Sequence, residues 1–147
     1  MSNWRTKEHI TMAINLTDQD KLTLRTAAYG AVTLMAAAGA AAGSPHRIAT
    51  QGSLALASAT GPIGYVLAEN GKIANLNGKS VAEIADHVLP ALTTAMGLLK
   101  EQDPAEADNF RSTVLVAVEA AVRPKKGEPG PVMAEMTRKI TGALDAA

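Results

Sequence analysis

The chain has 147 residues, with fourteen Lys and Arg, fourteen Asp and Glu, and no cysteine. This length corresponds to one domain, and the missing cysteines exclude a disulfide framework, a thiol nucleophile and a cysteine zinc site. A formal net charge of zero at pH 7 argues against nucleic acid as a partner, because nucleic-acid affinity depends on an excess of Lys and Arg.

Alanine supplies 29 residues, whereas Leu, Ile, Val, Met and the aromatic residues together supply 40. Alanine has the highest helix propensity, so the composition predicts an all-α fold, a single-domain bundle of five to six helices over residues 17–147. An N-terminal arm, residues 1–16, precedes it. Because alanine buries little apolar area, we expect each helix to need neighbours on several sides, some of them supplied by a second subunit.

The first helix is predicted to begin after Thr17, since Thr17 and Asp20 form an N-terminal capping signal, and to end at Gly43, a residue suited to a left-handed C-cap. This long, alanine-rich segment is expected to be the central helix. Its inward face is predicted to contain Leu24, Ala28, Ala31, Met35, Ala38 and Ala42.

The second helix is expected to start at Ser44 and Pro45, a cap followed by proline at the first helical position. Gly61 and Pro62 should end it, and a short third helix is predicted from Pro62 to about Glu69. Whether these two helices are separate stays open. The turn-rich stretch 70–79 follows, with a tiny strand over 73–76 as an alternative.

The clearest predicted helix runs from Ser80 to about Glu101, opened by a capping box of Ser80 and Glu83. Pro90 lies inside it and removes one backbone hydrogen bond, so we expect a kink between Asp86 and Pro90, or a restart there. The inward stripe is predicted to contain Val81, Ile84, Ala85, Val88, Leu92, Ala95, Met96 and Leu99.

Two more helices complete the predicted bundle. One begins at Asp103 and Pro104 and continues to Arg123, with a strand over 113–118 as the less favoured alternative; a linker over 124–130 then leads to a helix from Pro131 to near the end. Their inward residues are predicted to be Phe110, Val114, Ala117, Val118 and Ala121 in the first, and Met133, Met136, Ile140, Ala143 and Leu144 in the second.

An uncharged stretch over 26–45 reaches the length that a bilayer requires. It consists mainly of Ala, Gly and Thr, and insertion favours Leu, Ile, Phe and Val, so the sequence favours an interior helix of a soluble bundle, with no membrane partner. The first forty residues include Glu8, Asp18 and Asp20 and lack a compact leucine-rich segment. We therefore expect no export signal and a cytoplasmic location.

Ser44, His46 and Arg47 form the one candidate binding site in the sequence. His46 and Arg47 place positive charge in the first turn of a predicted helix, where the helix dipole disfavours cations. Either both side chains fold back onto the carbonyl end of the preceding helix, which is the favoured interpretation, or the three residues bind a phosphate or carboxylate.

No other pattern indicates chemistry. Glu83 and His87 have an i, i+4 spacing compatible with one metal ion, but they are predicted to lie on the solvent face of their helix with Asp86. The sequence has no Gly-x-Ser-x-Gly motif, so no catalytic serine is indicated. We therefore assign no catalytic residue, no metal and no cofactor, and an enzyme is less favoured than a non-catalytic protein.

Two functions follow as hypotheses. The first is a non-catalytic helical protein that acts through self-association as a homo-oligomer, most simply a dimer, and through a possible protein partner. The alternative is a helical bundle that binds a small apolar or anionic ligand. In that case the methionine-containing stripes of the helices at 80–101 and 131–147 are its expected walls, and His46 or Arg47 is its anchor.

Overall fold

The computed structural model describes residues 15–42, 45–69, 73–76, 79–122 and 130–147. Within these ranges the structure is helical with no strand, which confirms the all-α prediction. The elements are α2 (Asp18–Ala38), the 3₁₀ helix η1 (Gly39–Ala42), α3 (Pro45–Ala57), α4 (Gly61–Ala68), α5 (Val81–Gln102), α6 (Pro104–Val122) and α7 (Pro131–Asp145).

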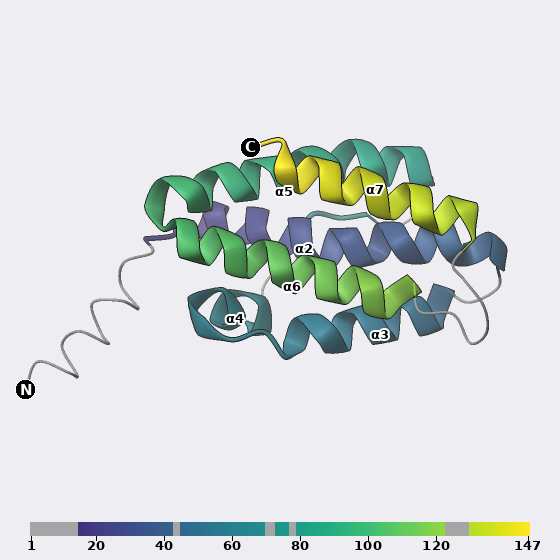
Figure 1. Ribbon diagram of the computed structural model, residues 1–147, viewed down its shortest axis with the longest axis horizontal. Coiled ribbons are helices and arrows are strands. Elements are labelled where there is room, and N and C mark those ends of the chain that lie inside the picture. The colour runs from purple at the N-terminus through teal and green to yellow at the C-terminus, as the bar shows by residue number, and fades with distance from the viewer. Residues whose placement is uncertain (1–14, 43–44, 70–72, 77–78, 123–129) are drawn as a thin grey trace, which may run out of the picture.

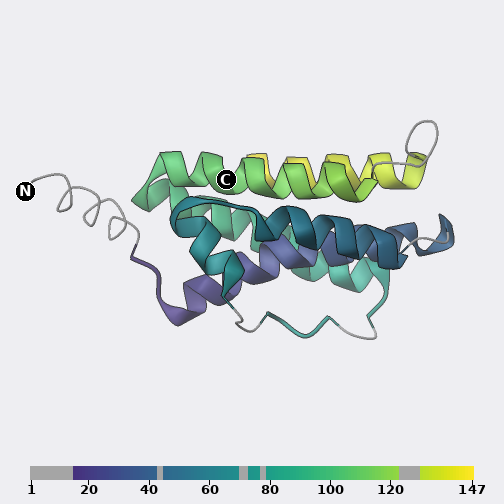
Figure 2. The same ribbon diagram turned by 90° about the horizontal axis from the view of Figure 1, so that it is seen from below.

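The central position predicted for the first helix is confirmed, because α2 contacts every helix from α3 to α7. In Figure 1, α5 and α7 lie along one side of α2, α3 and α4 lie along the other, and α6 crosses the front of the bundle. Figure 2 shows the same bundle from below, with α6 and α7 forming its upper layer and residues 73–76 lying along the opposite edge.

The alanines of α2 are buried by larger side chains from its neighbours. Ala27, Ala28 and Ala31 are completely buried within this one chain. Large, fully buried side chains from the surrounding helices fill the space around them, among them Leu56, Ile63, Leu67, Leu92, Met96, Leu99, Phe110, Ile140 and Leu144. The need for neighbours on several sides is therefore met inside one protomer, and burial of α2 does not depend on the second subunit that the composition suggested.

Both capping boxes form as predicted. The Thr17 hydroxyl accepts a hydrogen bond from the Asp20 amide at 3.0 Å, and the Asp20 carboxylate accepts one from the Thr17 amide at 3.1 Å. Ser80 and Glu83 repeat this exchange at 3.2 and 2.9 Å. These bonds satisfy backbone donors that have no partner inside the helix, and they fix where α2 and α5 begin.

Several helix boundaries settle alternatives that the sequence left open. The second and third helices are separate, since α3 ends at Ala57 and α4 begins at Gly61, whose φ of +75° lies in the left-handed region that glycine tolerates. Residues 73–76 form no strand and residues 113–118 are helical. The first helix tightens into η1 from Gly39 onward instead of continuing as an α-helix.

Pro90 lies inside α5, which continues unbroken from Val81 to Gln102. The possibility that the helix restarts there is therefore wrong, and the kink stays a prediction. Position 90 is exposed, so the proline ring lies on the outer side of the helix. Val88 and Leu92, two residues before and two residues after the proline, are buried on the packed side of α5.

The predicted inward faces agree closely with burial. Every residue predicted to face inward in α6 is buried, and so are Met133, Met136, Ile140 and Leu144 in α7. Some predictions fall outside the part of the chain that the structure describes. They concern the side chain of Ala42, the helix end at Arg123 and the linker 124–129. Across the described helices, none is both long enough and apolar enough to cross a membrane.

Candidate functional site

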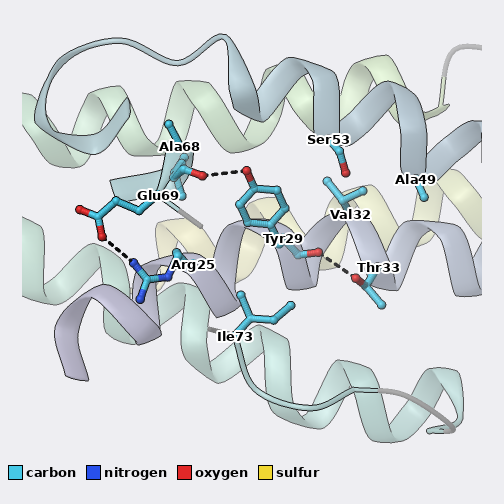
Figure 3. A pocket seen from close by; sticks show the side chains of 10 residues that line it. Arg25, Tyr29, Val32, Thr33, Ala49, Ser53, Ala68, Glu69 and Ile73 are labelled. Carbon is cyan, nitrogen blue, oxygen red and sulfur yellow. Dashed lines mark hydrogen bonds and ion pairs between the residues drawn. The ribbon is translucent and has the colours of Figure 1, made fainter. Parts of the chain in front are cut away.

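A groove with a volume of about 550 Å³ lies between α2, α3 and the C-terminal end of α4 (Figure 3). We call it the α2–α3 groove. The described residues that line it are Arg25, Tyr29, Val32, Thr33, Ala49, Ser53, Leu67, Ala68, Glu69 and Ile73. Its volume is within the range of about 300–1,000 Å³ that is typical of small-molecule sites.

The floor of the α2–α3 groove is one side of α2. Arg25, Tyr29 and Thr33 follow one another at intervals of four residues, which places them along a single helical stripe. The Thr33 hydroxyl donates to the Tyr29 carbonyl at 2.9 Å, so its hydrogen is used within α2. The stripe therefore places three groups toward α3 and α4: the buried guanidinium of Arg25, the phenol of Tyr29 and the hydroxyl of Thr33, whose hydrogen is already bonded within α2.

Tyr29 joins α2 to the end of α4. Its side chain points from α2 toward Ala68 in Figure 3, and its hydroxyl donates to the Leu67 carbonyl at 2.8 Å. Burial raises the pKa of the Tyr29 phenol above its usual value, so the group stays neutral near pH 7 and remains a hydrogen-bond donor. This contact caps a carbonyl near the last turn of α4 and holds the upper wall of the groove.

The remaining walls are mainly apolar. Ala49 and Ser53 line the groove from α3, with Ser53 pointing toward Val32 in Figure 3. On another side, the Ala74 amide donates to the Thr26 hydroxyl at 3.0 Å, which attaches the segment 73–76 to α2. Ile73, with 38% of its surface exposed, is thereby held at the groove as an apolar edge.

One end of the α2–α3 groove is charged. The Arg25 side chain is only 10% exposed, and its Nη1 lies 3.3 Å from Oε2 of Glu69. Lys21, one helical turn before Arg25, places its Nζ 3.8 Å from the other carboxylate oxygen. Two cations at i, i+4 repel each other, so the carboxylate between them stabilises this end of α2.

The predicted anion site over Ser44, His46 and Arg47 is only partly described. Ser44 lies outside the described residues, His46 is exposed and Arg47 is half-buried. His46 lines a shallow depression of about 410 Å³ on α3. That depression shares Ala49 and Ser53 with the α2–α3 groove. His46 therefore lies near the end of the groove that is away from Arg25 and Glu69. Anion binding at these three residues stays a prediction.

The other sequence candidates are placed apart from the α2–α3 groove. The Glu83 carboxylate accepts the Ser80 amide in the capping box, and His87 is exposed on α5. Within the described ranges, no three His, Cys, Asp or Glu side chains lie together as a potential metal site.

The methionine stripes predicted as walls of a ligand cavity lie apart from the α2–α3 groove. Met96, Met133 and Met136 are buried in the hydrophobic core, where they pack against other side chains, and they do not line the α2–α3 groove. Methionine adapts to irregular gaps in a core as readily as to a ligand.

Sequence reasoning missed Arg25, Tyr29 and Glu69. A signal was present, because Arg25 is the last charge before a long uncharged stretch and has a tyrosine one turn later on the same stripe. Charged side chains are almost never buried without a partner, so a charge at the edge of an apolar stretch is a candidate for a buried pair. Its partner Glu69, 44 residues further along the chain, has no such local signal.

Comparison with known proteins adds no functional information. No protein-family model matches the chain, and neither a curated protein nor a solved structure matches it.

Proposed function

We propose that this protein binds a small amphipathic molecule in the α2–α3 groove and does so without catalysis. The observation that carries the proposal is the combination of apolar walls, formed by Val32, Ala49 and Ile73, with a buried cation at one end. Sites for small molecules typically join apolar surface to a few placed polar groups in this way. The role is the alternative hypothesis of the sequence, moved from the methionine stripes to α2 and α3.

The lining supports binding more than chemistry. Among the described residues that form it, the Tyr29 hydroxyl donates to a backbone carbonyl and Glu69 is paired with Arg25. A nucleophile needs a base within hydrogen-bond reach, and among the described residues no hydrogen bond joins the Ser53 hydroxyl to either group. A cytoplasmic location, expected from the sequence, is consistent with this function and remains part of the proposal.

The first experiment is native mass spectrometry of the freshly purified protein, followed by calorimetric titration with 1-decanol and decanoate below the concentrations at which they self-associate. Ala49→Leu places extra bulk in the groove, whereas Ala57→Leu makes the same change at the exposed end of α3. We expect Ala49→Leu to weaken binding at least tenfold, and Ala57→Leu to leave it within twofold. Equal affinity in both variants, or no binding by the wild type, would refute the proposal.

Self-association is the second candidate function. Leu54 on α3 and Val116 on α6 are 61% and 55% exposed, and these two helices pack against each other. Contiguous exposed apolar surface marks an interface between subunits, and we propose that Leu54 and Val116 contribute to such a surface. Sedimentation of Leu54→Ser and Val116→Ser together, against the wild type at the same concentrations, tests this: a dimer that uses this surface becomes a monomer in the double variant.

A further inference from the structure

We infer that the molecule bound in the α2–α3 groove is a neutral alcohol, whose hydroxyl group donates a hydrogen bond to the Thr33 hydroxyl. This inference rests on the proposed function and adds the chemical class of the ligand. It concerns the three hydroxyl groups among the described lining residues, those of Tyr29 and Thr33 on α2 and that of Ser53 on α3.

The first argument is that two of these hydroxyl groups have already used their hydrogen. The Thr33 hydroxyl donates to the Tyr29 carbonyl at 2.9 Å, and the Tyr29 hydroxyl donates to the Leu67 carbonyl at 2.8 Å. A hydroxyl has one hydrogen to donate, but its oxygen can also accept hydrogen bonds. Toward the groove both groups therefore act as acceptors, and a polar group of the ligand beside them must bring a hydrogen of its own.

The second argument disfavours a carboxylate as that polar group. An ionised carboxylate only accepts hydrogen bonds, so its oxygens would face the acceptor oxygens of Tyr29 and Thr33. Polar groups that leave water without gaining a hydrogen-bond partner cost free energy. The cation at the end of the groove does not require an anionic ligand, because Glu69 lies 3.3 Å from Arg25 and Arg25 has a further interaction.

The third argument disfavours an ammonium group. Lys21 and Arg25 place two cations at one end of the groove, with the carboxylate of Glu69 between them. A further positive charge in the groove is repelled by these cations. An uncharged hydroxyl avoids this repulsion, and it can donate to Thr33 while its oxygen accepts from the Ser53 hydroxyl. An alcohol with an apolar chain therefore fits both the hydroxyl groups and the apolar walls.

The test compares 1-decanol with its isomer 1-methoxynonane by calorimetric titration. The two compounds have the same atoms, but the ether oxygen carries no hydrogen. We expect 1-decanol to bind the wild type about three- to tenfold more tightly, which is the usual contribution of one neutral hydrogen bond. Decanoate, which has no hydrogen to donate at pH 7, should also bind more weakly than 1-decanol.

Thr33→Val removes the proposed acceptor while keeping the shape of the side chain, and Thr137→Val is its matched control. Thr137 is also partly buried, and its hydroxyl also donates to the carbonyl four residues earlier, that of Met133, at 2.9 Å. It lies on α7 and does not line the groove. Thr33→Val should bind the alcohol and the ether equally, whereas Thr137→Val should keep the wild-type preference for the alcohol.

The comparison on the wild type decides the inference even if Thr33→Val fails to fold. Three results would overturn the alcohol assignment and leave the groove as a binding site: equal affinity for the alcohol and the ether, tighter binding of decanoate than of 1-decanol, or a preference for the alcohol that survives Thr33→Val. Failure of all three compounds to bind the wild type would instead overturn the proposed function itself.

Discussion

Gly52 lies at a close contact between α2 and α3, and its replacement by alanine tests the packing that forms the α2–α3 groove. A Cβ atom at position 52 would lie 2.7 and 2.8 Å from the two Cγ atoms of Val32. Carbon atoms prefer separations of about 3.5–4.0 Å, and Val32 is 3% exposed within the core. The added methyl group therefore forces α3 and α2 apart or forces Val32 out of its rotamer.

The size of the effect follows from two opposing contributions. Gly→Ala inside a helix stabilises by about 1 kcal/mol through backbone entropy and helix propensity, whereas overpacking of a filled core costs about 1–3 kcal/mol. Gly52→Ala should therefore lower the free energy of unfolding by up to about 2 kcal/mol. Gly142→Ala is the matched control, because nothing lies within 4 Å of its Cβ, and it should be stabilising by about 1 kcal/mol.

The assay is urea unfolding followed by circular dichroism, with the midpoints of both variants compared with the wild type. Val32→Ala provides a direct check on the cause, since it removes the two methyl groups that Gly52→Ala would strike. In the Val32→Ala background, Gly52→Ala should become neutral or stabilising, which is the non-additivity expected of residues in contact. If Gly52→Ala stabilises the wild type as much as Gly142→Ala does, the close contact between α2 and α3 is not present in solution.

Two further predictions concern a helix end and a surface ion pair. Ser80→Ala removes the hydroxyl that accepts the Glu83 amide, so it should lower the free energy of unfolding by about 1 kcal/mol, seen as a lower midpoint in thermal unfolding. The hydrogen bond from Arg111 lowers the pKa of Asp145, so this pair stabilises the folded state above the ordinary aspartate pKa and loses that effect as the pH falls through the lowered value. Urea unfolding between pH 7 and pH 3 should show a smaller acid-induced loss in Asp145→Asn than in the wild type, and equal losses would contradict the assignment.

The capped helix starts and the inward faces were predictable because the interactions that fix them are local. Thr17 and Ser80 reach backbone amides three residues away, and the buried stripe of α6 follows from residues spaced three and four apart. The same local reasoning failed where tertiary packing decides. The sequence alone did not show that Pro90 can sit on the exposed side of an unbroken α5.

The α2–α3 groove was not predictable for a related reason. Its charged end joins Arg25 to Glu69 across 44 residues, and its wall depends on Tyr29 reaching the carbonyl of Leu67 in another helix. Each residue alone is typical of an ordinary helix. Only the path of the chain from α2 through α3 to α4 brings them to one place, and no short motif encodes that path.

The groove has the same origin as the close packing. Val32 fills the space beside Gly52, and the residues of α3 that line the groove next to this contact are the small Ala49 and Ser53. These side chains are too small to fill the space between α2 and α3 beside that contact. The two helices thus pack tightly at Gly52 and leave a groove beside it. The same small side chains that make the helices slim therefore also account for the groove between α2 and α3.

This reasoning changes what self-association would mean for the protein. Ala27, Ala28 and Ala31 are buried by the chain's own helices. A dimer would therefore join protomers whose hydrophobic cores are already complete. Dissociation should then precede unfolding: the sedimentation coefficient should fall on dilution while the circular dichroism stays helical. An obligate dimer would instead lose both together, with an unfolding midpoint that rises with protein concentration. Agreement with the second pattern would show that the single-chain core is not sufficient for folding.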